Sequence, residues 1–380
     1  MVLGNSMLIP VFPQMKEAMR LTQFQVGLIV TFFSVPAGLL IPLAGFLSDQ
    51  YGRKPIMVPA LFVYGAGGLI CGFAAVALKN PYPLLLAGRV VQGIGAGGTY
   101  QLAMALTGDI FQSSERTKAL GLLEAFNGLG KVVSPILGSL IALISWYAPF
   151  FAYSIITFPI AIGIWLLVKE NNPKLKKQSF SDYWQEVKAI FKEKARLLLS
   201  SYAVGMAALF ILFGVLSYIS DILESTHSLY GLKKGLVIAI PVFSMATTSY
   251  LGGAFLADRK NLWKWAIVGG MVLSTISLVL LPLFGDLIPM MAVLFFLGIG
   301  IGVVLPPINT LITGAASTER RGIVTCLYGT VRFFGVAIGP PTFGLVMQFG
   351  QWVTFLGAAA ITASAGIIAL LFITPPEDNE

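Results

Sequence analysis

Charged residues are scarce in this chain of 380 residues. They make up 11% of the sequence, whereas ordinary soluble domains contain about 25%. This composition excludes a water-soluble domain built around a single core. The net charge of +8 comes from basic residues clustered in short loops between apolar runs, so the sequence does not indicate a nucleic-acid partner.

Histidine and cysteine are nearly absent as well. His227 stands alone in a polar loop, and Cys71 and Cys326 both lie inside apolar runs. This excludes a disulfide framework and a cysteine-based zinc site.

The G-x-x-x-x-G-K-[ST] motif is missing, so we do not expect ATP as the direct energy source. With no nucleophile or metal cluster for catalysis, we expect no metal, no cofactor and no enzymatic activity.

Apolar residues and glycine, in contrast, are abundant. Apolar residues account for 56% of the chain, and 41 residues are glycine. Glycine is enriched where helices pack closely in lipid. The composition therefore predicts an all-α membrane protein whose helices are apolar nearly all round.

Twelve apolar runs follow one another with short breaks. The first has about 14 residues, where about 20 are needed to cross a bilayer. We therefore expect the chain to lack a native N-terminal tail and the first part of its first span, although a mis-assigned start codon would look the same. The predicted spans are residues 1–15, 24–47, 55–78, 83–108, 119–143, 147–168, 197–222, 232–256, 263–284, 287–315, 322–348 and 352–373.

The one long polar connection covers residues 169–196 and separates two six-span halves, residues 1–168 and 197–380. Apolar and aromatic residues recur at helical spacing in its second part, which favours an amphipathic helix lying on the membrane surface. These residues are Phe180, Tyr183, Trp184, Val187 and Ile190.

The loops differ in positive charge. Of the lysines and arginines, 17 lie in the loops that follow even-numbered spans and five on the other side. Cytoplasmic loops carry the excess of positive charge. Both termini and the long connection are therefore expected in the cytoplasm, and the chain in the cell membrane.

The two halves repeat each other in order. GFLSDQYGRK matches AFLADRKNLW, GIGAG matches GIGIG, SER matches TER, and GKVVSP matches GVAIGP. Four matches in register indicate duplicated, pseudo-symmetric halves.

The string GFLSDQYGRK, residues 45–54, is similar to the signature loop of the major facilitator superfamily. The whole chain resembles the twelve-span drug:proton antiporters of that superfamily. The resemblance implies two six-helix halves around a central cavity, and a cytoplasmic latch in which the main roles fall on Asp49 and Arg53. A plain positively charged loop is the alternative. The latch candidates are Gly45, Asp49, Gly52, Arg53, Lys54, Asp109, Glu115 and Arg116.

In the fourth span, Gly93, Gly95 and Gly98 match the formal dinucleotide pattern G-x-G-x-x-G. No βαβ unit surrounds them, so close helix packing is the better explanation. Arg89 resembles the family's span-4 arginine, and the resemblance implies a role in proton coupling. The alternative is a side chain that reaches the external headgroups.

Small residues form a ridge in the fifth span that partly matches the family's antiporter signature. A ridge of this kind lets a second helix approach closely, and it recurs in the eleventh span. Its members are Gly130, Ser134, Pro135, Gly138, Gly335, Gly339 and Pro340.

Charges at membrane depth are the candidates for proton coupling: Glu124, Lys131, Arg332, Arg89 and Asp221. An ionised group at the bilayer centre costs about 3 kcal/mol or more. A carboxylate such as Glu124, placed between apolar surroundings and a cation, can load and release a proton. A static ion pair and partial hydration from the cytoplasm are the alternatives. Two central cations against one carboxylate fit poorly with a purely cationic drug.

The resemblance places the substrate cavity among spans 1, 4, 7 and 10. The polar or aromatic candidates there are Asn5, Tyr100, Gln101, Phe213, Ser217 and Asn309.

These observations predict a monomeric, proton-coupled secondary transporter that exports small amphiphilic compounds or drugs across the lipid bilayer by alternating access. The first alternative is a narrow-specificity carrier of a lipid, sugar or organic anion. The second, of another class, is a non-transporting membrane sensor on the same fold.

Overall fold

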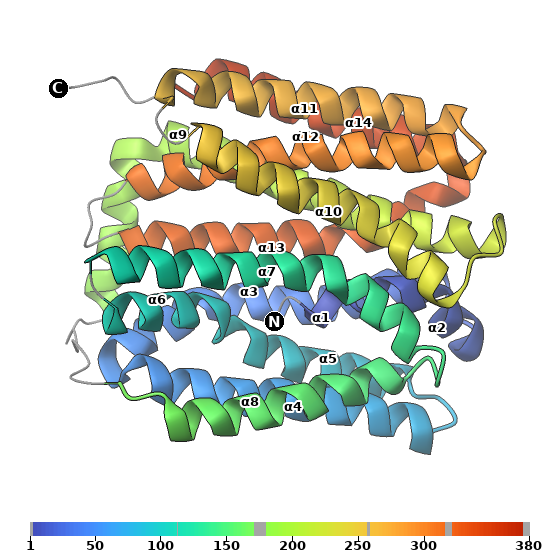
Figure 1. The fold of residues 1–380 in the computed structure, drawn as a ribbon, viewed down its shortest axis with the longest axis horizontal. Coiled ribbons are helices and arrows are strands. Elements are labelled where there is room, and N and C mark those ends of the chain that lie inside the picture. The colour runs from blue at the N-terminus through green and yellow to red at the C-terminus, as the bar shows by residue number, and fades with distance from the viewer. Residues whose placement is uncertain (1–2, 112, 171–179, 257–258, 316–320, 375–380) are drawn as a thin grey trace.

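The computed structural model describes residues 3–111, 113–170, 180–256, 259–315 and 321–374. This part of the chain is helical and contains no strand. In this part of the chain, ten helices are long and apolar enough to cross a membrane. Most helices lie roughly along one common axis (Figure 1). The structure therefore agrees with the predicted all-α membrane architecture.

In its described residues the first half contains eight α-helices, two of them short pieces of the first predicted span. That span extends to residue 19 rather than 15, with a 3-10 turn at Ile9–Val11 between its two pieces. The helices are α1 Leu3–Ser6, α2 Phe12–Met19, α3 Gln23–Tyr51, α4 Arg53–Ala77, α5 Tyr82–Gly97, α6 Tyr100–Ile110, α7 Ser113–Ile141 and α8 Ala148–Leu167.

The second half contains six helices, and 3-10 turns flank α11 and follow α13. The turns are Lys260–Leu262, Leu281–Leu283 and Met347–Phe349. The helices are α9 Phe180–Ser225, α10 Gly231–Leu256, α11 Trp263–Leu280, α12 Leu287–Gly314, α13 Arg321–Val346 and α14 Gln351–Phe372.

The fourth span is broken, so the prediction of one uninterrupted segment over residues 83–108 is wrong. α5 ends at Gly97 and α6 begins at Tyr100. Thr99 between them has φ −117° and ψ −74°, and its hydroxyl donates to the Ala96 carbonyl across 2.8 Å. Glycine is a weak helix former, and the local run Gly97-Gly98 supplies the weak point.

Residues 180–196 of the predicted linker and the seventh span form a single 46-residue helix, α9, with non-helical dihedrals at Lys194. Val187 and Ile190 are buried while Trp184 is half exposed, which fits the predicted amphipathic pattern. The side chains of Phe180 and Tyr183 lie outside the described residues. The first part of α9 crosses the end of the bundle (Figure 1).

The small-residue ridges bring equivalent helices together in the two halves. A Cβ atom on Gly138 of α7 would collide with the Met7 carbonyl oxygen, in the turn between α1 and the first 3-10 turn. A Cβ atom on Gly335 of α13 would collide with the Met206 carbonyl oxygen of α9. At each of these two glycines, the absence of a side chain thus allows backbone contact with one partner segment.

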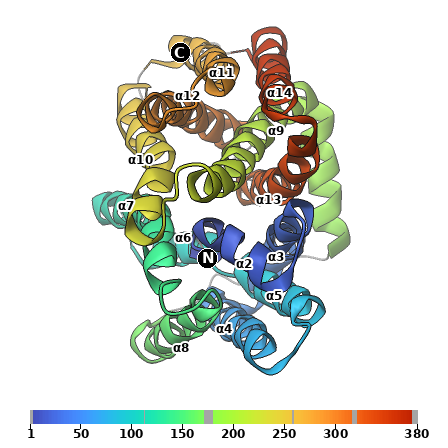
Figure 2. The ribbon, with the colours of Figure 1, turned by 90° about the vertical axis from the view of Figure 1, so that its right-hand side faces the viewer.

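The two halves meet along α3 and α13. The Thr31 hydroxyl donates to the Ala337 carbonyl across 2.6 Å, and the Thr330 hydroxyl donates to the Gly38 carbonyl across 2.7 Å. These hydrogen bonds tie the halves together near the middle of both helices. Figure 2 shows α3 beside α13.

The second contact between the halves, α7 with α10, is confined to one end. A Cβ on Gly235 would lie 2.9 Å from the Ser139 side chain, and one on Gly231 would lie 3.1 Å from that of Leu143. Toward the other end, Gly128 and Gly252 have no described atom within 4 Å of a Cβ, and the two helices separate (Figure 1). We call the separated end, where α3 meets α4, the latch end.

Candidate functional site

Arg89 lies in the centre of the first half and is 0% exposed. Its guanidinium donates to the Ile29 carbonyl across 3.0 Å, to Oε1 of Gln92 across 2.5 Å and to Oδ1 of Asn5 across 2.5 Å. The guanidinium also lies 4.3 Å from the centre of the Phe33 ring. The arginine is thus held by three α-helical segments and fills the space between them.

These contacts bear on two predicted site residues, Arg89 and Asn5. Full burial excludes the alternative in which Arg89 reaches the external headgroups. Asn5, predicted to face the substrate, instead holds Arg89 and donates its own amide to the Ser34 hydroxyl across 2.8 Å. No carboxylate of the described residues pairs with Arg89 within 4.0 Å.

Glu124 on α7 is held by two neutral side chains. The Tyr100 hydroxyl donates to Oε2 of Glu124. The Asn127 amide donates to the same oxygen across 3.3 Å and to the Tyr100 hydroxyl across 3.1 Å. Sequence reasoning missed Asn127, although a residue three positions along a helix lies on the same face as Glu124.

Lys131 and Arg332 approach this group from opposite halves. The charges of Arg332 and Glu124 both act on Lys131, and Arg332 also acts on Tyr100. Neither cation lies within 4.0 Å of a carboxylate among the described residues. Glu124 therefore forms a close ion pair with neither of them. We call Tyr100, Glu124, Asn127, Lys131 and Arg332 the central cluster.

The remaining cavity candidates lie in different surroundings. The Gln101 amide is next to Gly329 on α13, where a Cβ would lie 3.1 Å from Nε2, so it borders the central cluster. Ser217 is buried, Phe213 is half-buried and Asn309 is exposed. None of these three has a polar side-chain contact with the central cluster in the described part of the chain.

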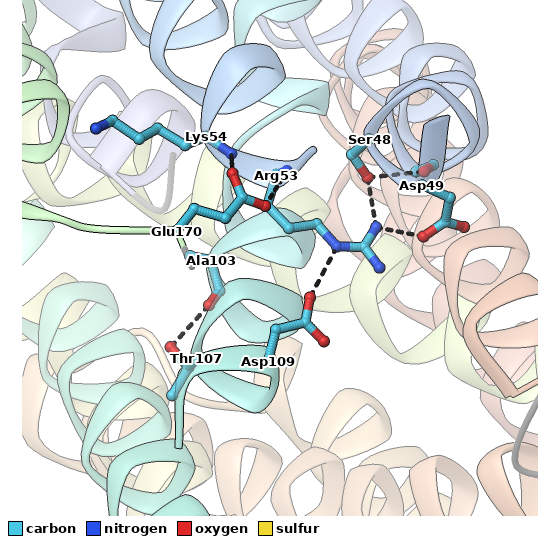
Figure 3. Close-up of polar contacts among 9 residues, drawn as sticks. Ser48, Asp49, Arg53, Lys54, Ala103, Thr107, Asp109 and Glu170 are labelled. Carbon is cyan, nitrogen blue, oxygen red and sulfur yellow. Dashed lines mark hydrogen bonds and ion pairs between the residues drawn. The ribbon is translucent and has the colours of Figure 1, made fainter. Parts of the chain in front are cut away.

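Arg53 lies between the other polar side chains of the predicted latch (Figure 3). Its guanidinium pairs with Asp49 across 2.5 Å and with Asp109 across 3.2 Å, and it donates to the Ser48 hydroxyl across 2.6 Å. Gly52 between the helices has φ +100°, a conformation that favours glycine. The glycine therefore permits the tight turn that presents Arg53.

Glu170 completes the latch and was missed by sequence reasoning, because it lies at the start of the predicted linker. Its two carboxylate oxygens accept the backbone N–H groups of Arg53 and Lys54 across 2.7 and 3.0 Å. The N-terminus of a helix has unpaired N–H groups and a positive partial charge. Glu170, just beyond the end of α8, thus caps the start of α4 (Figure 3).

The latch contacts described so far all lie within the first half. Lys54 donates to the Val168 carbonyl across 2.8 Å. The contact with the second half is made by Gly45, where a Cβ would lie 3.3 Å from Sγ of Cys326. Glu115 is exposed and has no ion pair among the described residues, and the side chain of Arg116 lies outside them.

The end opposite the latch carries two further ion pairs. Lys16 pairs with Asp221 across 3.0 Å and so connects the halves, and Lys234 pairs with Glu224 across 2.6 Å. Lys234 is only 2% exposed, although the sequence placed it among loop cations. Asp221, predicted for proton coupling, is engaged by a lysine in this structure.

No group of three or more His, Cys, Asp or Glu side chains placed to hold a metal ion occurs among the described residues. The geometry instead offers a polar cluster between two helical halves, with a latch at one end and ion pairs at the other.

Curated relatives cover the chain from end to end. The bacillibactin exporter of Bacillus subtilis is 39% identical over 382 aligned residues, which cover 100% of this chain and 95% of the relative. The quinolone resistance protein NorA of Staphylococcus aureus is 25% identical, with 97% and 92% covered.

Solved structures support the fold. A bacterial homologue of the human lysosomal transporter Spinster, in an inward-facing and occupied conformation, matches with a TM-score of 0.77 at 16% identity, covering 97% of this chain and 93% of that one. The human organic anion transporter MFSD10 matches with a TM-score of 0.71 at 19% identity, covering 97% and 98%.

The family model of the Major Facilitator Superfamily matches residues 1–340 and, in an overlapping second match, residues 264–380. With the duplicated helical halves, the signature loop and the full-length relatives in agreement, the chain belongs to the Major Facilitator Superfamily of membrane transporters.

Proposed function

We propose that this chain is a proton-coupled secondary transporter that exports small amphiphilic compounds by alternating access. The observation that carries the proposal is the asymmetry of the two ends. α7 and α10 touch at the end opposite the latch and separate toward the latch end. A carrier that alternates between two openings needs such one-sided states, with its binding site between the halves.

The direction of the opening follows from the loops. The latch end holds the loops with the excess of lysine and arginine, which favours the cytoplasmic side for this end and for both termini. The structure then corresponds to a state open to the cytoplasm, from which an exporter takes up its cargo. Export is further supported by the 39% identical relative, whose name is that of an exporter.

The cargo of that relative, bacillibactin, is the first compound to test on this chain. Drugs are the second class, because a quinolone resistance protein is also related over nearly the full length. The two cations of the central cluster favour a carrier of narrow specificity for an organic anion over a broad exporter of cationic drugs.

Proton coupling is assigned to Glu124. Its side chain is exposed, and Tyr100 and Asn127 donate hydrogen bonds to it without neutralising its charge. Lys131 lies on the first half and Arg332 on the second, so relative movement of the halves changes the charge around Glu124. We also assign a supporting role to Arg89, which fixes the packing of α1, α3 and α5 around the path of the moving halves.

Purified protein in liposomes with an acidic lumen and a neutral exterior tests the proposal. Bacillibactin and a fluorescent quinolone are supplied outside, and their accumulation is followed with and without a proton ionophore. The expected result is accumulation of at least one compound that the ionophore abolishes. Equal uptake by empty liposomes, for both compounds, would contradict the proposed function.

The role of Glu124 is tested in the same liposomes with Glu124→Gln. This variant should lose accumulation driven by the gradient but keep exchange of labelled for unlabelled cargo. Glu193→Gln, at an exposed residue of α9, is the matched control and should behave as the unmodified chain. Gradient-driven accumulation by Glu124→Gln would remove Glu124 from the coupling mechanism.

We further propose that the transporter acts as a monomer, because one chain contains both halves and the space between them. Light scattering on the detergent-solubilised protein checks this, and a stable dimer that is required for transport would contradict it.

A further inference from the structure

Lys131 and Arg332 are like charges on different halves, and each lies one helical turn from a residue beside α6: Lys131 from Asn127, and Arg332 from Gly329. Lys131 lies on α7 of the first half and Arg332 on α13 of the second, and both side chains are half-buried. α13 also borders α6 at this level, because Gly329 lies against the Gln101 amide. The two cations therefore belong to one site.

Glu124, the carboxylate that the described residues place in the central cluster, already accepts hydrogen bonds from the neutral side chains of Tyr100 and Asn127. Neither cation has a described carboxylate within 4.0 Å. The central cluster thus carries two positive charges and one negative charge. An uncompensated positive charge at membrane depth is costly, and such cations normally mark a wet pathway or a missing partner.

The aromatic surroundings add a second requirement. The Arg332 guanidinium lies 5.4 Å from the centre of the Tyr328 ring, and the Tyr100 ring stands beside Glu124. Aromatic faces and guanidinium planes pack well against flat organic groups. Tyr328 is only 3% exposed, so the half-buried Tyr100 ring and the Arg332 plane are the groups that suit a ligand with both a charged group and an aromatic body.

We infer that Lys131 and Arg332 together bind the anionic group of an organic substrate, and that this group draws the two halves together at the latch end. The inference rests on the proposed transport function and names its substrate class. The matching chemistry is a carboxylate or another anion with two acceptor oxygens beside an aromatic ring. Arginine binds such a group through two parallel N–H donors, and lysine binds it as a point charge.

Binding and conformation are linked by the position of the cations on different halves. Without an anion, repulsion between Lys131 and Arg332 favours separation of α7 and α13. With an anion between them, both cations are attracted to the same group. A ligand shifts a conformational equilibrium by its difference in affinity for the two states. An anionic substrate thereby promotes closure of the latch end.

The first test compares three probes that share a naphthalene ring and carry a negative, a neutral and a positive substituent: 2-naphthoate, 2-naphthamide and 2-naphthylmethylamine. Their affinities for the purified full chain in detergent are measured by titration calorimetry. We expect 2-naphthoate to bind at least tenfold more tightly than the other two. Equal affinity for the three probes would overturn the inference.

Variants assign the preference to the two cations. Lys131→Gln and Arg332→Gln should each reduce the affinity for 2-naphthoate at least tenfold and abolish the preference over the amide. Lys131→Arg, which keeps the charge, should retain the preference. Lys118→Gln, at an exposed cation on the same helix, is the control and should bind as the unmodified chain. A preference that survives in both glutamine variants would overturn the inference.

The second test measures closure with spin labels on Leu122 of α7 and Leu251 of α10, both exposed residues of the latch-end halves of these helices. Addition of 2-naphthoate should shorten the distance between the labels, and the amide should not. A distance unchanged by 2-naphthoate would overturn the link to closure.

Transport by the same liposomes separates this inference from the proposed function. Charge-selective binding without movement of 2-naphthoate or bacillibactin would contradict the transport function and leave the anion site in place. Gradient-driven transport that is unchanged in Lys131→Gln and Arg332→Gln would contradict the anion site and leave the transport function in place.

Discussion

Lys16 and Asp221 form an ion pair of 3.0 Å that joins the two halves at the end opposite the latch. They are 205 residues apart in the sequence. Beside them, the Ser220 hydroxyl donates to the Ile9 carbonyl across 2.6 Å. This end is thus closed by specific polar contacts, whereas α7 and α10 separate at the latch end.

Removal of the Lys16–Asp221 pair should open this end. Asp221→Asn keeps the shape of the side chain but loses the charge, and partly exposed pairs of this kind contribute about 1 kcal/mol or less. We expect the open population to rise up to about fivefold. Distances between spin labels on Ile144 and Leu232 measure this population.

Two variants make the test of this pair specific. Lys16→Asp combined with Asp221→Lys should restore the closed state, because the attraction is retained with the charges exchanged. Lys233→Ala, at an exposed lysine of the same end, should leave the distances unchanged. An unaltered distance distribution in Asp221→Asn would show that the pair does not hold this end closed.

Gly138 and Gly128 should respond in opposite ways to replacement by alanine. A Cβ on Gly138 would collide with the Met7 backbone oxygen, while a Cβ on Gly128 meets no described atom within 4 Å. Alanine is a better helix former than glycine by about 1 kcal/mol. Gly128→Ala should therefore preserve or raise the thermal unfolding temperature in detergent, and Gly138→Ala should lower it. Equal effects of both changes would argue against the packing ridge.

Arg89→Lys should destabilise the first half although it preserves the charge. The three hydrogen bonds to Ile29, Gln92 and Asn5 come from three different guanidinium nitrogens. The single ammonium nitrogen of a lysine cannot reproduce that spread of donors. Each hydrogen bond to a charged group contributes about 1.5–3 kcal/mol. We expect a loss of stability of about 3 kcal/mol, visible in denaturant unfolding. Arg259→Lys, at an exposed arginine, serves as the control, and equal stability of the two variants would contradict this interpretation.

Glu170→Ala should loosen the start of α4. The variant removes both acceptors of the Arg53 and Lys54 amides, and the loss of a helix cap costs about 0.5–2 kcal/mol. Hydrogen exchange of these two amides should accelerate up to about thirtyfold. Glu193→Ala, which removes an exposed carboxylate elsewhere, should leave them protected. Unchanged protection in Glu170→Ala would show that the cap does not hold the latch.

Much of the architecture could be predicted from the sequence. Spanning segments are recognised by hydrophobic runs of about 20 residues, and the ridge around Gly138 by its spacing of four. Asp49 and Arg53 were both singled out by the resemblance of residues 45–54 to the family's signature loop, and they lie close together along the chain on either side of Gly52. Each of these features depends on residues that are close together along the chain.

The candidate site was only partly predictable. Tyr100 and Glu124 were both identified, but as members of different groups, and Asn127 was not identified at all. Glu170 was assigned to a linker, although it caps a helix that begins 117 residues earlier. A hydrogen bond requires two atoms within about 3 Å, and the sequence contains no information on the rotation of one helix against another.

The sequence by itself determined the membrane class, the order of the spans and the duplicated halves, because hydrophobicity and local spacing are sufficient for each. The family followed from the resemblance of residues 45–54 to its signature loop. Only the tertiary structure decided which group each of these charges contacts: Arg89 meets neutral acceptors, Glu124 meets Tyr100, and Lys16 meets Asp221. Such contacts depend on helix rotation and on the break at Thr99, and these are fixed by packing of the whole bundle.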